Sequence, residues 1–507
     1  MTKLSGPFIG SIDQGTSSSR FIIFDKQGKV VTFHQEEFKG IFQKPGWVEH
    51  DPNTIWKTVT NCIEKCCEKF KELGYNLEDL KSVGITNQRE TTVCWDKTTH
   101  EPLGTAIVWS DNRTQDYVSK WQDDYMKKNL QERSGLRLST YFSGLKLRWK
   151  LDHCEQTQKA LQAGNLLFGT IDSWLIYKLS QHNEQPTHVT DVTNASRTCL
   201  MHIEELKWDD ELIKFFDIPT EILPTIKSSA EVYCKVSDGP LKGIPVAGCL
   251  GDQQAAMVGQ NCFEAGSAKN TYGTGCFMLF NIGEKPYIST HGLLTTVGFQ
   301  FGNNKPVYAL EGSIAVAGSA IQWLRDGLGL IQESKEIGEN ASKVEDNGGV
   351  YFVTALSGLL APYWKPEAKG TIVGLTQYAT KSHICRAVLE AACFQTRAIL
   401  ESMNQDSQTE LKGLKVDGGM TNSDFFTQIQ SDLLGIQVER PHNKESTAWG
   451  AAIAAGLATG IWKDLKQLQD EVHDEKDIFK PTLPKEERDR LFEEWNHAVE
   501  KCIHSKI

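Results

Sequence analysis

A turn rich in hydroxyl groups near the start of the chain limits most strongly what this sequence can fold into. Residues 13–20 read Asp-Gln-Gly-Thr-Ser-Ser-Ser-Arg and lie between two apolar, strand-like runs, Phe8–Ile12 and Phe21–Phe24. The glycine permits a tight turn, and the hydroxyls, backbone N–H groups and arginine are donors for phosphate oxygens. Asp13 adds a carboxylate that suits a phosphate-bound magnesium ion. The turn predicts a phosphate site between two strands or, as the alternative, a plain hairpin turn.

A second turn of this kind occurs about half a chain length later. Residues 272–276 read Tyr-Gly-Thr-Gly-Cys and again separate two apolar runs, Ala268–Thr271 and Phe277–Phe280. The sequence contains neither a Walker loop nor a Gly-x-Gly-x-x-Gly helix start. Two such turns indicate two related halves that hold a nucleotide between their hairpins.

The order of the predicted elements indicates an α/β fold with mixed sheets. At 507 residues the chain is too long for one hydrophobic core, so we expect two domains, 1–258 and 259–507. The first has predicted strands at 8–12, 20–25, 30–34, 81–86 and 92–95 and a helix at 53–71. The second repeats this plan, with strands near 268, 277 and 293, helices at 314–325 and 382–403, and a strand–Gly-Gly–helix element at 414–434. A small-residue helix at 448–456 could pack beneath that element.

Composition excludes several classes of function. The net charge of −11 argues against a nucleic-acid or anionic-membrane partner. No apolar run is long enough to span a bilayer, and the N-terminus has no apolar signal region. The 13 scattered cysteines indicate reduced thiols, so we expect a cytoplasmic protein. The final Ser505-Lys506-Ile507 differs from the peroxisomal signal Ser-Lys-Leu, and we interpret the similarity as chance.

Polar residues follow two predicted strands, in the position where open α/β sheets place ligand contacts. Arg89 and Glu90 come after strand 81–86 and would suit a polyhydroxylated substrate; an exposed, salt-bridged loop is the alternative. Asp252 starts a predicted helix, so it could cap that helix or act as a base in the cleft between the domains. Trp109 and Tyr141 are candidates for core aromatics or for pocket walls.

Several long strings resemble the FGGY carbohydrate kinases of the actin–hexokinase ATPase superfamily, and among these the glycerol kinases. The resemblance runs from Ile9 to about Leu465. Its strings are Ser-Ile-Asp-Gln-Gly-Thr at 11–16, Lys-Pro-Gly-Trp-Val-Glu-His-Asp-Pro at 44–52, Gly-Ile-Thr-Asn-Gln-Arg-Glu-Thr-Thr at 84–92, Tyr-Phe-Ser-Gly-Leu-Lys at 141–146, Asp-Val-Thr-Asn-Ala-Ser-Arg-Thr at 191–198, Gly-Asp-Gln-Gln at 251–254, Lys-Asn-Thr-Tyr-Gly-Thr-Gly-Cys at 269–276, and the signature region from 358–364 to 371–376.

The resemblance implies two duplicated ribonuclease-H-like (actin-like ATPase) domains, with mixed sheets flanking a catalytic cleft. It also implies ATP-dependent phosphorylation of glycerol to sn-glycerol 3-phosphate with release of ADP. That reaction would serve glycerol catabolism and the supply of glycerolipid precursors. We expect glycerol and ATP as the partners, and a homodimer or higher homo-oligomer as the assembly.

The resemblance further implies roles for individual residues. Asp13 would hold Mg²⁺, and Asp252 would be the general base. The residues that would bind the hydroxyls or cover the carbon backbone of glycerol are Arg89, Glu90, Trp109, Tyr141, Asp252, Gln253 and Phe277. The residues that would contact the nucleotide are Thr16, Ser17, Ser18, Arg20, Thr274, Gly318, Gln322, Gly419 and Ser423. The family usually has asparagine where this chain has Ser423, and Asn422 precedes it, so either residue could make that contact.

Two alternatives stay open at this point. One is a kinase for a longer polyol or sugar, such as xylulose or gluconate. The other is a non-enzymatic actin-like ATPase that polymerises or binds clients. The pairs Arg89-Glu90 and Asp252-Gln253 favour an enzyme, because a polymerising ATPase needs no polar cradle for an alcohol.

Overall fold

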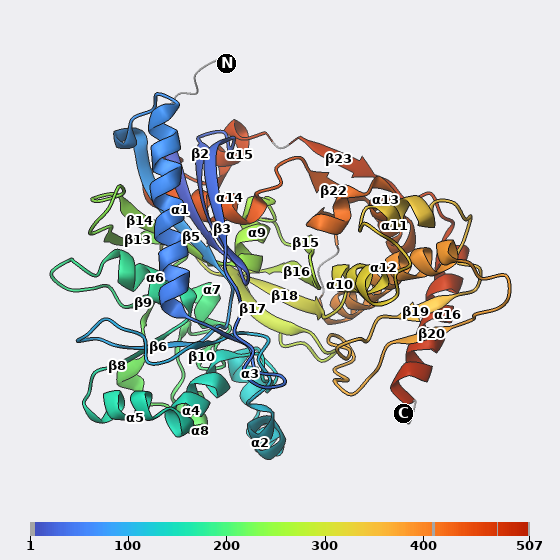
Figure 1. Cartoon of the computed structure of the whole chain (residues 1–507), viewed down its shortest axis with the longest axis horizontal. Coiled ribbons are helices and arrows are strands. Elements are labelled where there is room, and N and C mark those ends of the chain that lie inside the picture. Colours follow the sequence, from blue (N-terminus) through green and yellow to red (C-terminus); the bar gives the residue numbers. More distant parts are fainter. Residues whose placement is uncertain (1–5, 408–410, 474, 505–507) are drawn as a thin grey trace.

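The computed structural model describes residues 6–407, 411–473 and 475–504. Its two lobes lie side by side, and each is built around a mixed sheet (Figure 1). The first lobe contains the sheet of β1 and the second lobe the sheet of β15. The C-terminal tripeptide 505–507, with its similarity to a peroxisomal signal, lies outside the described residues.

The sheet of the first lobe has the order β13-β14-β5-β1-β2-β3 among the described residues. Its strands are β1 (Phe8–Gln14), β2 (Ser18–Asp25), β3 (Val30–Glu37), β5 (Leu80–Asn87), β13 (Ala230–Lys235) and β14 (Pro245–Gly251). β1, β2 and β3 form an antiparallel meander, whereas β5 is parallel to both β1 and β14. The carboxyl ends of β1, β5 and β14 therefore meet at one edge of the sheet, where Asp13, Arg89 and Asp252 lie.

The sheet of the second lobe repeats this arrangement. Its order is β17-β18-β16-β15-β21-β22-β23 within the part of the chain that the structure describes. The strands are β15 (Ser267–Tyr272), β16 (Cys276–Gly283), β17 (Leu294–Phe299), β18 (Val307–Ile314), β21 (Gly413–Asp417), β22 (Val438–Pro441) and β23 (Lys476–Phe479). β15 pairs antiparallel with β16 and parallel with β21, as β1 does with β2 and β5. The prediction of two related halves with mixed sheets is confirmed.

Helices cover both sheets. In the first lobe α1 (Pro52–Glu72) packs on β2 and β3, and the side chain of Asp51 caps its N-terminus by accepting two backbone N–H groups. Its buried face includes Cys66 and Cys67, and burial raises the pKa of both thiols to about 12. In the second lobe the helices are α10 (Gly318–Gln322), α11 (Glu336–Ala341), α12 (Lys381–Asp406), α13 (Asp424–Leu434) and α16 (Lys485–His504).

A long insertion between β5 and β14 forms the lower part of the first lobe in Figure 1. Its helices are α2 (Gln115–Lys127), α3 (Leu130–Ser134), α4 (Ser143–His153), α5 (Glu155–Gln162), α6 (Ile171–Leu179), α7 (Val192–Ala195) and α8 (Asp210–Phe216). Its short strands are β6 (Val93–Asp96), β7 (Ala106–Ile107), β8 (Leu166–Gly169), β9 (Val189–Asp191), β10 (Met201–His202), β11 (Lys207–Trp208) and β12 (Thr225–Lys227). Elsewhere the chain adds β4 (Glu49–His50), α9 (Asp252–Gly259), β19 (Tyr351–Val353), β20 (Thr371–Val373), α14 (Ser446–Ala458) and α15 (Leu465–Glu471).

The predicted helix at 314–325 is wrong at its N-terminal end. Ile314 is the last residue of β18, because residues 312–314 pair with residues 276–278 of β16. Helical structure begins at Gly318 with α10 and continues as a π-helical turn, Trp323–Gly327. Small residues alternate here with the β-branched Ile314 and Val316, which suit a strand, and pairing with β16 decides where the strand ends.

The small-residue helix α14 lies in a different place from the one predicted. It packs on β5, β14, β1 and α9 of the first lobe rather than beneath the strand–Gly-Gly–helix element. Small side chains allow this close contact: a Cβ atom at Gly450 would lie 1.8 Å from the carbonyl oxygen of Ala255. Figure 1 accordingly shows α14 within the first lobe, although most of the segments of similar colour lie in the second.

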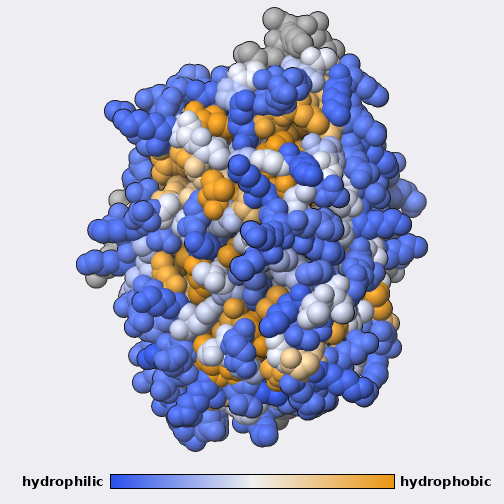
Figure 2. Space-filling view, turned by 90° about the vertical axis from the view of Figure 1, so that its left-hand side faces the viewer, coloured by the Kyte–Doolittle hydropathy of each residue, from blue (hydrophilic) through white to orange (hydrophobic). Residues whose placement is uncertain are grey.

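The surface of the first lobe is mostly hydrophilic on the side shown in Figure 2, and its hydrophobic residues form separate small groups. Such groups are normal on a surface that faces water. Among the described residues, no helix is long and apolar enough to cross a membrane.

Replacing Gly450 with alanine should destabilise the protein, because the added methyl group collides with the backbone of α9. We expect a loss of about 1–3 kcal/mol, the usual cost of overpacking, measured as a lower midpoint of thermal or denaturant unfolding. Gly413→Ala is the matched control, since a Cβ atom there meets only Gln437 O, at 3.8 Å. Equal midpoints for the two variants would contradict the assigned packing of α14.

Candidate active site

The first hydroxyl-rich turn joins β1 to β2 as a tight hairpin. The backbone N–H of Gly15 donates to the carbonyl oxygen of Ser18 at 2.9 Å, which leaves Thr16 and Ser17 exposed at the tip. The indole Nε1 of Trp109 donates to Thr16 Oγ1 at 3.0 Å. Thr16, which is predicted to contact phosphate, is therefore hydrogen-bonded to Trp109, which is predicted to cover the substrate.

The second turn is held against the start of α10. Gly273 N–H donates to Gly275 O at 2.9 Å, and the N–H groups of Ala317 and Ser319 donate to the carbonyl oxygen of Thr274 at 2.9 and 3.1 Å. Thr274 itself is exposed. The turn is thus rigid at its backbone and presents its hydroxyl residue to solvent.

Asp13 on β1 and Arg20 on β2 are opposite each other in the strand pair next to the first hairpin turn, and their side chains form an ion pair. Arg20 also pairs with Glu445 at 2.6 Å, at the N-terminus of α14. The residue predicted to hold magnesium and the arginine predicted to contact phosphate are therefore neighbours. Both lie where a segment from near the end of the chain meets the first hairpin.

A cavity of about 670 Å³ lies in the second lobe between the second turn, α10, α11 and α13. Cavities of this size suit a small cofactor. The predicted nucleotide residues that line it are Thr274, Gly318, Gln322, Gly419 and Ser423. Apolar side chains make up much of the remaining wall, including Ile321, Ile337, Leu389 and Met420. The structure thus brings the predicted adenosine residues together.

Both candidates for the polar contact in the strand–Gly-Gly–helix element line this cavity. The hydroxyl of Ser423 accepts the N–H of Phe426 at 3.3 Å and so caps α13. The amide of Asn422 donates to Gly419 O at 3.2 Å. Gly418 is required for the turn because its φ is +95° and a Cβ atom would lie 2.3 Å from Tyr272 O.

The second part of the site is a buried polar cradle after β5. Arg89 and Glu90 are 3% and 1% exposed, so the alternative of an exposed loop is wrong. The φ of Glu90 is 58°, a left-handed conformation that is uncommon for a residue other than glycine. Strain of this kind is often found at functional sites, where the surrounding contacts maintain it.

Arg89 is fixed by two carboxylates from other elements. Its NH1 and NH2 lie 2.5 and 2.9 Å from the two oxygens of Glu311 on β18, and its Nε lies 3.3 Å from Asp252 Oδ1. Glu90 Oε1 accepts from Arg197 Nε at 2.7 Å, and Arg197 also reaches Glu311 at 3.0 Å. Although burial opposes ionisation of Glu311, the two guanidinium groups lower its pKa to about 2.

Glu311 and Arg197 also belong to the site, although the sequence predicted neither of them as a site residue. Arg197 lies in the string at 191–198, which was noted only for its resemblance. Glu311 carries no local signal, since it is one charged residue within a β-strand. Only the pairing of the two lobes identifies it.

Asp252 is the first residue of α9, and Gly251 holds the N-cap position. The interpretation of Asp252 as the N-cap residue is therefore wrong. Its side chain is 31% exposed, and burial raises its pKa while Arg89 and Lys269 oppose that rise. A partly exposed carboxylate at the edge of the sheet can reach a bound ligand. Next to it, Gln253 Oε1 accepts from Lys269 Nζ, which leaves the amide NH₂ as the group free to donate.

Three aromatic rings stand around this cradle. The ring centroid of Trp109 lies 5.7 Å from that of Tyr141 and 6.1 Å from that of Phe277. All three side chains are only partly buried. Phe277 follows the second turn on β16, so Trp109 connects the first hairpin, the cradle and the second hairpin. This arrangement favours pocket walls over core aromatics.

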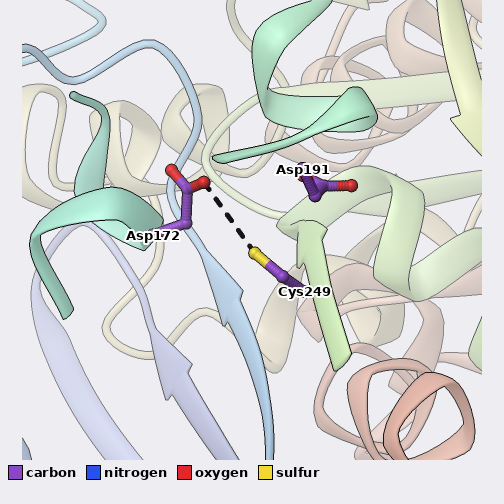
Figure 3. Close-up of side chains that lie close together, drawn as sticks. All are labelled: Asp172, Asp191 and Cys249. Atoms are coloured by element: carbon purple, nitrogen blue, oxygen red, sulfur yellow. Dashed lines mark hydrogen bonds between the residues drawn. The ribbon is translucent and has the colours of Figure 1, made fainter. Parts of the chain in front are cut away.

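A buried cluster of two aspartates and a cysteine lies next to the end of β14, close to the cradle. One carboxylate oxygen each of Asp172 and Asp191 and the Sγ atom of Cys249 lie within 4.8 Å of one another, and the Cys249 thiol donates to Asp172 Oδ2 at 3.8 Å (Figure 3). Burial and the nearby Asp172 raise the pKa of Asp191 to about 6. Asp191 caps α7, whose Thr193 hydroxyl accepts the N–H of Gly251 at 2.9 Å. The carboxylates already accept hydroxyl and backbone donors, and the cluster positions β14, which ends at Gly251 directly before Asp252.

Two domain models match the chain. The N-terminal domain of the FGGY family of carbohydrate kinases matches residues 8–259, and the C-terminal domain of the same family matches residues 268–459. The two lobes, the two hairpin turns and the cavity agree with that assignment. The chain belongs to the FGGY family of carbohydrate kinases, so the family resemblance is confirmed.

Within this family the chain is similar to proteins described as glycerol kinases. It is 52% identical over 496 residues to the glycerol kinase of Brucella anthropi, covering 98% of this chain and 99% of the relative. It is 50% identical over 503 residues to glycerol kinase 1 of Streptomyces avermitilis, covering 98% of each. The crystal structure of Plasmodium falciparum glycerol kinase with ADP matches with a TM-score of 0.92 and 38% identity over 100% of both chains. A gluconate kinase from Lactobacillus acidophilus, at 21% identity and a TM-score of 0.86 over 98% of both chains, shares the fold alone.

Replacing Gly419 with valine should block nucleotide binding without unfolding the protein. A Cβ atom at Gly419 meets no atom within 4 Å in the structure, and the residue lines the cavity, so the side chain would fill space expected to hold adenosine. We expect the affinity for ADP, measured by calorimetry, to fall at least about tenfold. The unfolding midpoint without nucleotide should match that of the Gly413→Ala control. Unchanged ADP affinity would contradict the assignment of this cavity.

Proposed function

We propose that the chain transfers the γ-phosphoryl group of ATP to glycerol and produces sn-glycerol 3-phosphate and ADP. The observation that carries this proposal is the cradle of buried Arg89 and Glu90 and partly exposed Asp252, next to three aromatic rings and the first hairpin turn. The similarity to glycerol kinases at about half identity over nearly the whole chain supports the choice of alcohol.

In the proposed complex the nucleotide lies across the two turns. Thr16, Ser17, Ser18 and Arg20 on the first hairpin and Thr274 on the second contact the phosphates. Gly318, Gln322, Gly419 and Ser423 line the adenosine side, in agreement with their common cavity. Hydroxyl groups, backbone N–H groups and a guanidinium group are suitable donors for phosphate oxygens.

Carboxylate oxygens near the first hairpin fit a magnesium ion, because this ion prefers carboxylate and phosphate oxygens as ligands. We propose that Asp13 holds the ion. Asp417 Oδ1 is buried and finds no hydrogen-bond partner among the described residues, while its other oxygen accepts from Ser446 next to Glu445. The carboxylate of Asp417 is therefore bonded to Ser446, the residue directly after the Glu445 that pairs with Arg20. When bound, the ion would neutralise charge on the transferred phosphate.

The glycerol hydroxyls would bind Arg89, Glu90, Tyr141, Asp252 and Gln253, with Trp109 and Phe277 against the carbon backbone. Asp252 would accept the proton of the attacking glycerol hydroxyl while the oxygen of that hydroxyl forms a bond to the γ-phosphorus. The bond between the γ-phosphorus and the bridging oxygen breaks, and that oxygen leaves with ADP. Phosphoryl transfer depends mainly on positioning and charge neutralisation, which this cradle is built to supply.

The proposal extends to the organisation of the chain. We propose functional units 1–258 and 259–507 whose closure excludes water from the reaction. We also propose a cytoplasmic enzyme that forms a homodimer or a higher homo-oligomer. In this scheme α14, from the second unit, completes the core of the first.

Asp252→Asn should abolish most of the turnover and leave nucleotide binding intact, because the amide cannot accept the proton. We expect kcat to fall by about 10²–10⁴ and the ADP affinity to stay at the wild-type value. The residue lies at the edge of the sheet and is not the helix cap, so the unfolding midpoint should change little. Near wild-type turnover of the variant would remove Asp252 from the role of base.

Substrate selectivity tests the function itself. A site that bonds each hydroxyl of a three-carbon alcohol should discriminate against analogues that leave buried groups unpaired. In a coupled assay of ADP release, glycerol should show the highest kcat/KM and dihydroxyacetone a lower one, with xylulose, ribulose and gluconate near background. A preference for a pentulose would contradict the choice of glycerol and leave the proposed nucleotide site unaffected.

Sedimentation with ATP alone would detect filaments if the chain were a polymerising ATPase.

A further inference from the structure

We infer that Glu311 is a positioning residue for the substrate site: from the second lobe it orients Arg89 and, together with Arg197, fixes the geometry of the alcohol cradle. This inference rests on the proposed function and extends it to a residue outside the predicted site. Glu311 is fully buried in the middle of β18. It lies in the second sheet, whereas both of its guanidinium partners come from the first lobe.

The Glu311 carboxylate accepts one N–H group from each terminal nitrogen of Arg89, and these two nitrogens also lie 3.3 Å from Gln254 Oε1 and 3.4 Å from the Tyr141 hydroxyl oxygen. Both terminal nitrogens of Arg89 lie within hydrogen-bond distance of the Glu311 carboxylate, which is the bidentate geometry that gives orientation as well as energy. The remaining Nε faces Asp252 Oδ1 at 3.3 Å and Glu90 Oε1 at 3.9 Å. The donor side of Arg89 is thereby directed toward the carboxylates that would bind the alcohol.

The same strand pair supplies both the anchor and the wall of the pocket. In the β16–β18 register Leu279 lies opposite Glu311 and Phe277 lies opposite Ser313. Since side chains two residues apart in a strand point to the same face, Phe277 and Glu311 share one face of the sheet. The Cζ atom of Arg89 lies 6.0 Å from the centre of the Phe277 ring. A movement of β18 would therefore shift the anchor of Arg89 and the pocket wall together.

Charge balance explains why Glu311 cannot be replaced by a neutral residue without disturbing the cradle. The buried charged groups here are the cations Arg89, Arg197 and Lys269 and the anions Glu90 and Glu311, and the partly exposed Asp252 adds a third anion. Without the Glu311 carboxylate, two guanidinium groups would compete for Glu90 and Asp252. Arg89 would then turn toward the proposed base, and the arrangement that receives the alcohol would be lost.

The test compares Glu311→Gln, Arg197→Gln, the double variant and the wild-type full chain. We expect Glu311→Gln to raise the KM for glycerol about tenfold or more and to leave the KM for ATP at the wild-type value. The double variant restores the balance of charge, so it should recover thermal stability lost by Glu311→Gln but keep the raised KM for glycerol. A purely structural role would let stability and the KM for glycerol recover together.

Glu390→Gln is the matched control. Glu390 is a buried glutamate of α12 that is bonded to Arg386 at 2.8 Å and Asn347 at 3.0 Å, within the second lobe. Its replacement should lower the unfolding midpoint without changing the KM for glycerol. A wild-type KM for glycerol in Glu311→Gln would overturn the inference. If Glu311→Gln fails to fold, the double variant replaces it, and a wild-type KM for glycerol in the double variant would overturn the inference. A wild-type enzyme that does not phosphorylate glycerol would instead contradict the proposed function.

Discussion

The close contact of α14 with the first sheet is the constraint on which the rest of the structure depends. The helix comes from near the end of the chain, yet it packs on strands from its first third and on α9. Its first residues then reach both halves of the site, because Glu445 bonds Arg20 and Ser446 bonds Asp417. The start of this helix therefore links the first hairpin turn to the end of β21 in the second lobe.

The cradle adds a second link between the lobes, and it is electrostatic. Burying charged groups costs several kcal/mol for each ion unless good geometry compensates. Here Arg89 is nearly fully buried, and Glu311 crosses from one sheet to the other to meet it. The left-handed Glu90 adds local strain at the same point. A chain that keeps such an arrangement at the edge of a sheet does so where function requires charged groups in fixed positions.

Local signals predicted most of the fold and much of the site. The hairpin turns follow from glycine and hydroxyl residues between apolar runs, and Arg89 was found because it follows a strand. Glu311 could not be found in this way, because it lies 222 residues from Arg89 and its own strand gives no sign of the partner. The start of α10 was misplaced for a related reason, since the pairing of Ile314 with Cys276 outweighs weak local preference.

The position of α14 has a consequence for how the protein is made. When ribosomal synthesis has reached the end of β14, every strand of the first sheet exists, but the helix that covers one face of it does not. Ile9, Ala247 and Leu250, which belong to the same apolar cluster as Trp449, stay uncovered until most of the second lobe has also been translated. The face of the first sheet that α14 covers therefore waits for a late segment, whereas the apolar cluster of the first lobe that contains Phe8, Val59 and Trp174 consists only of residues made before α9.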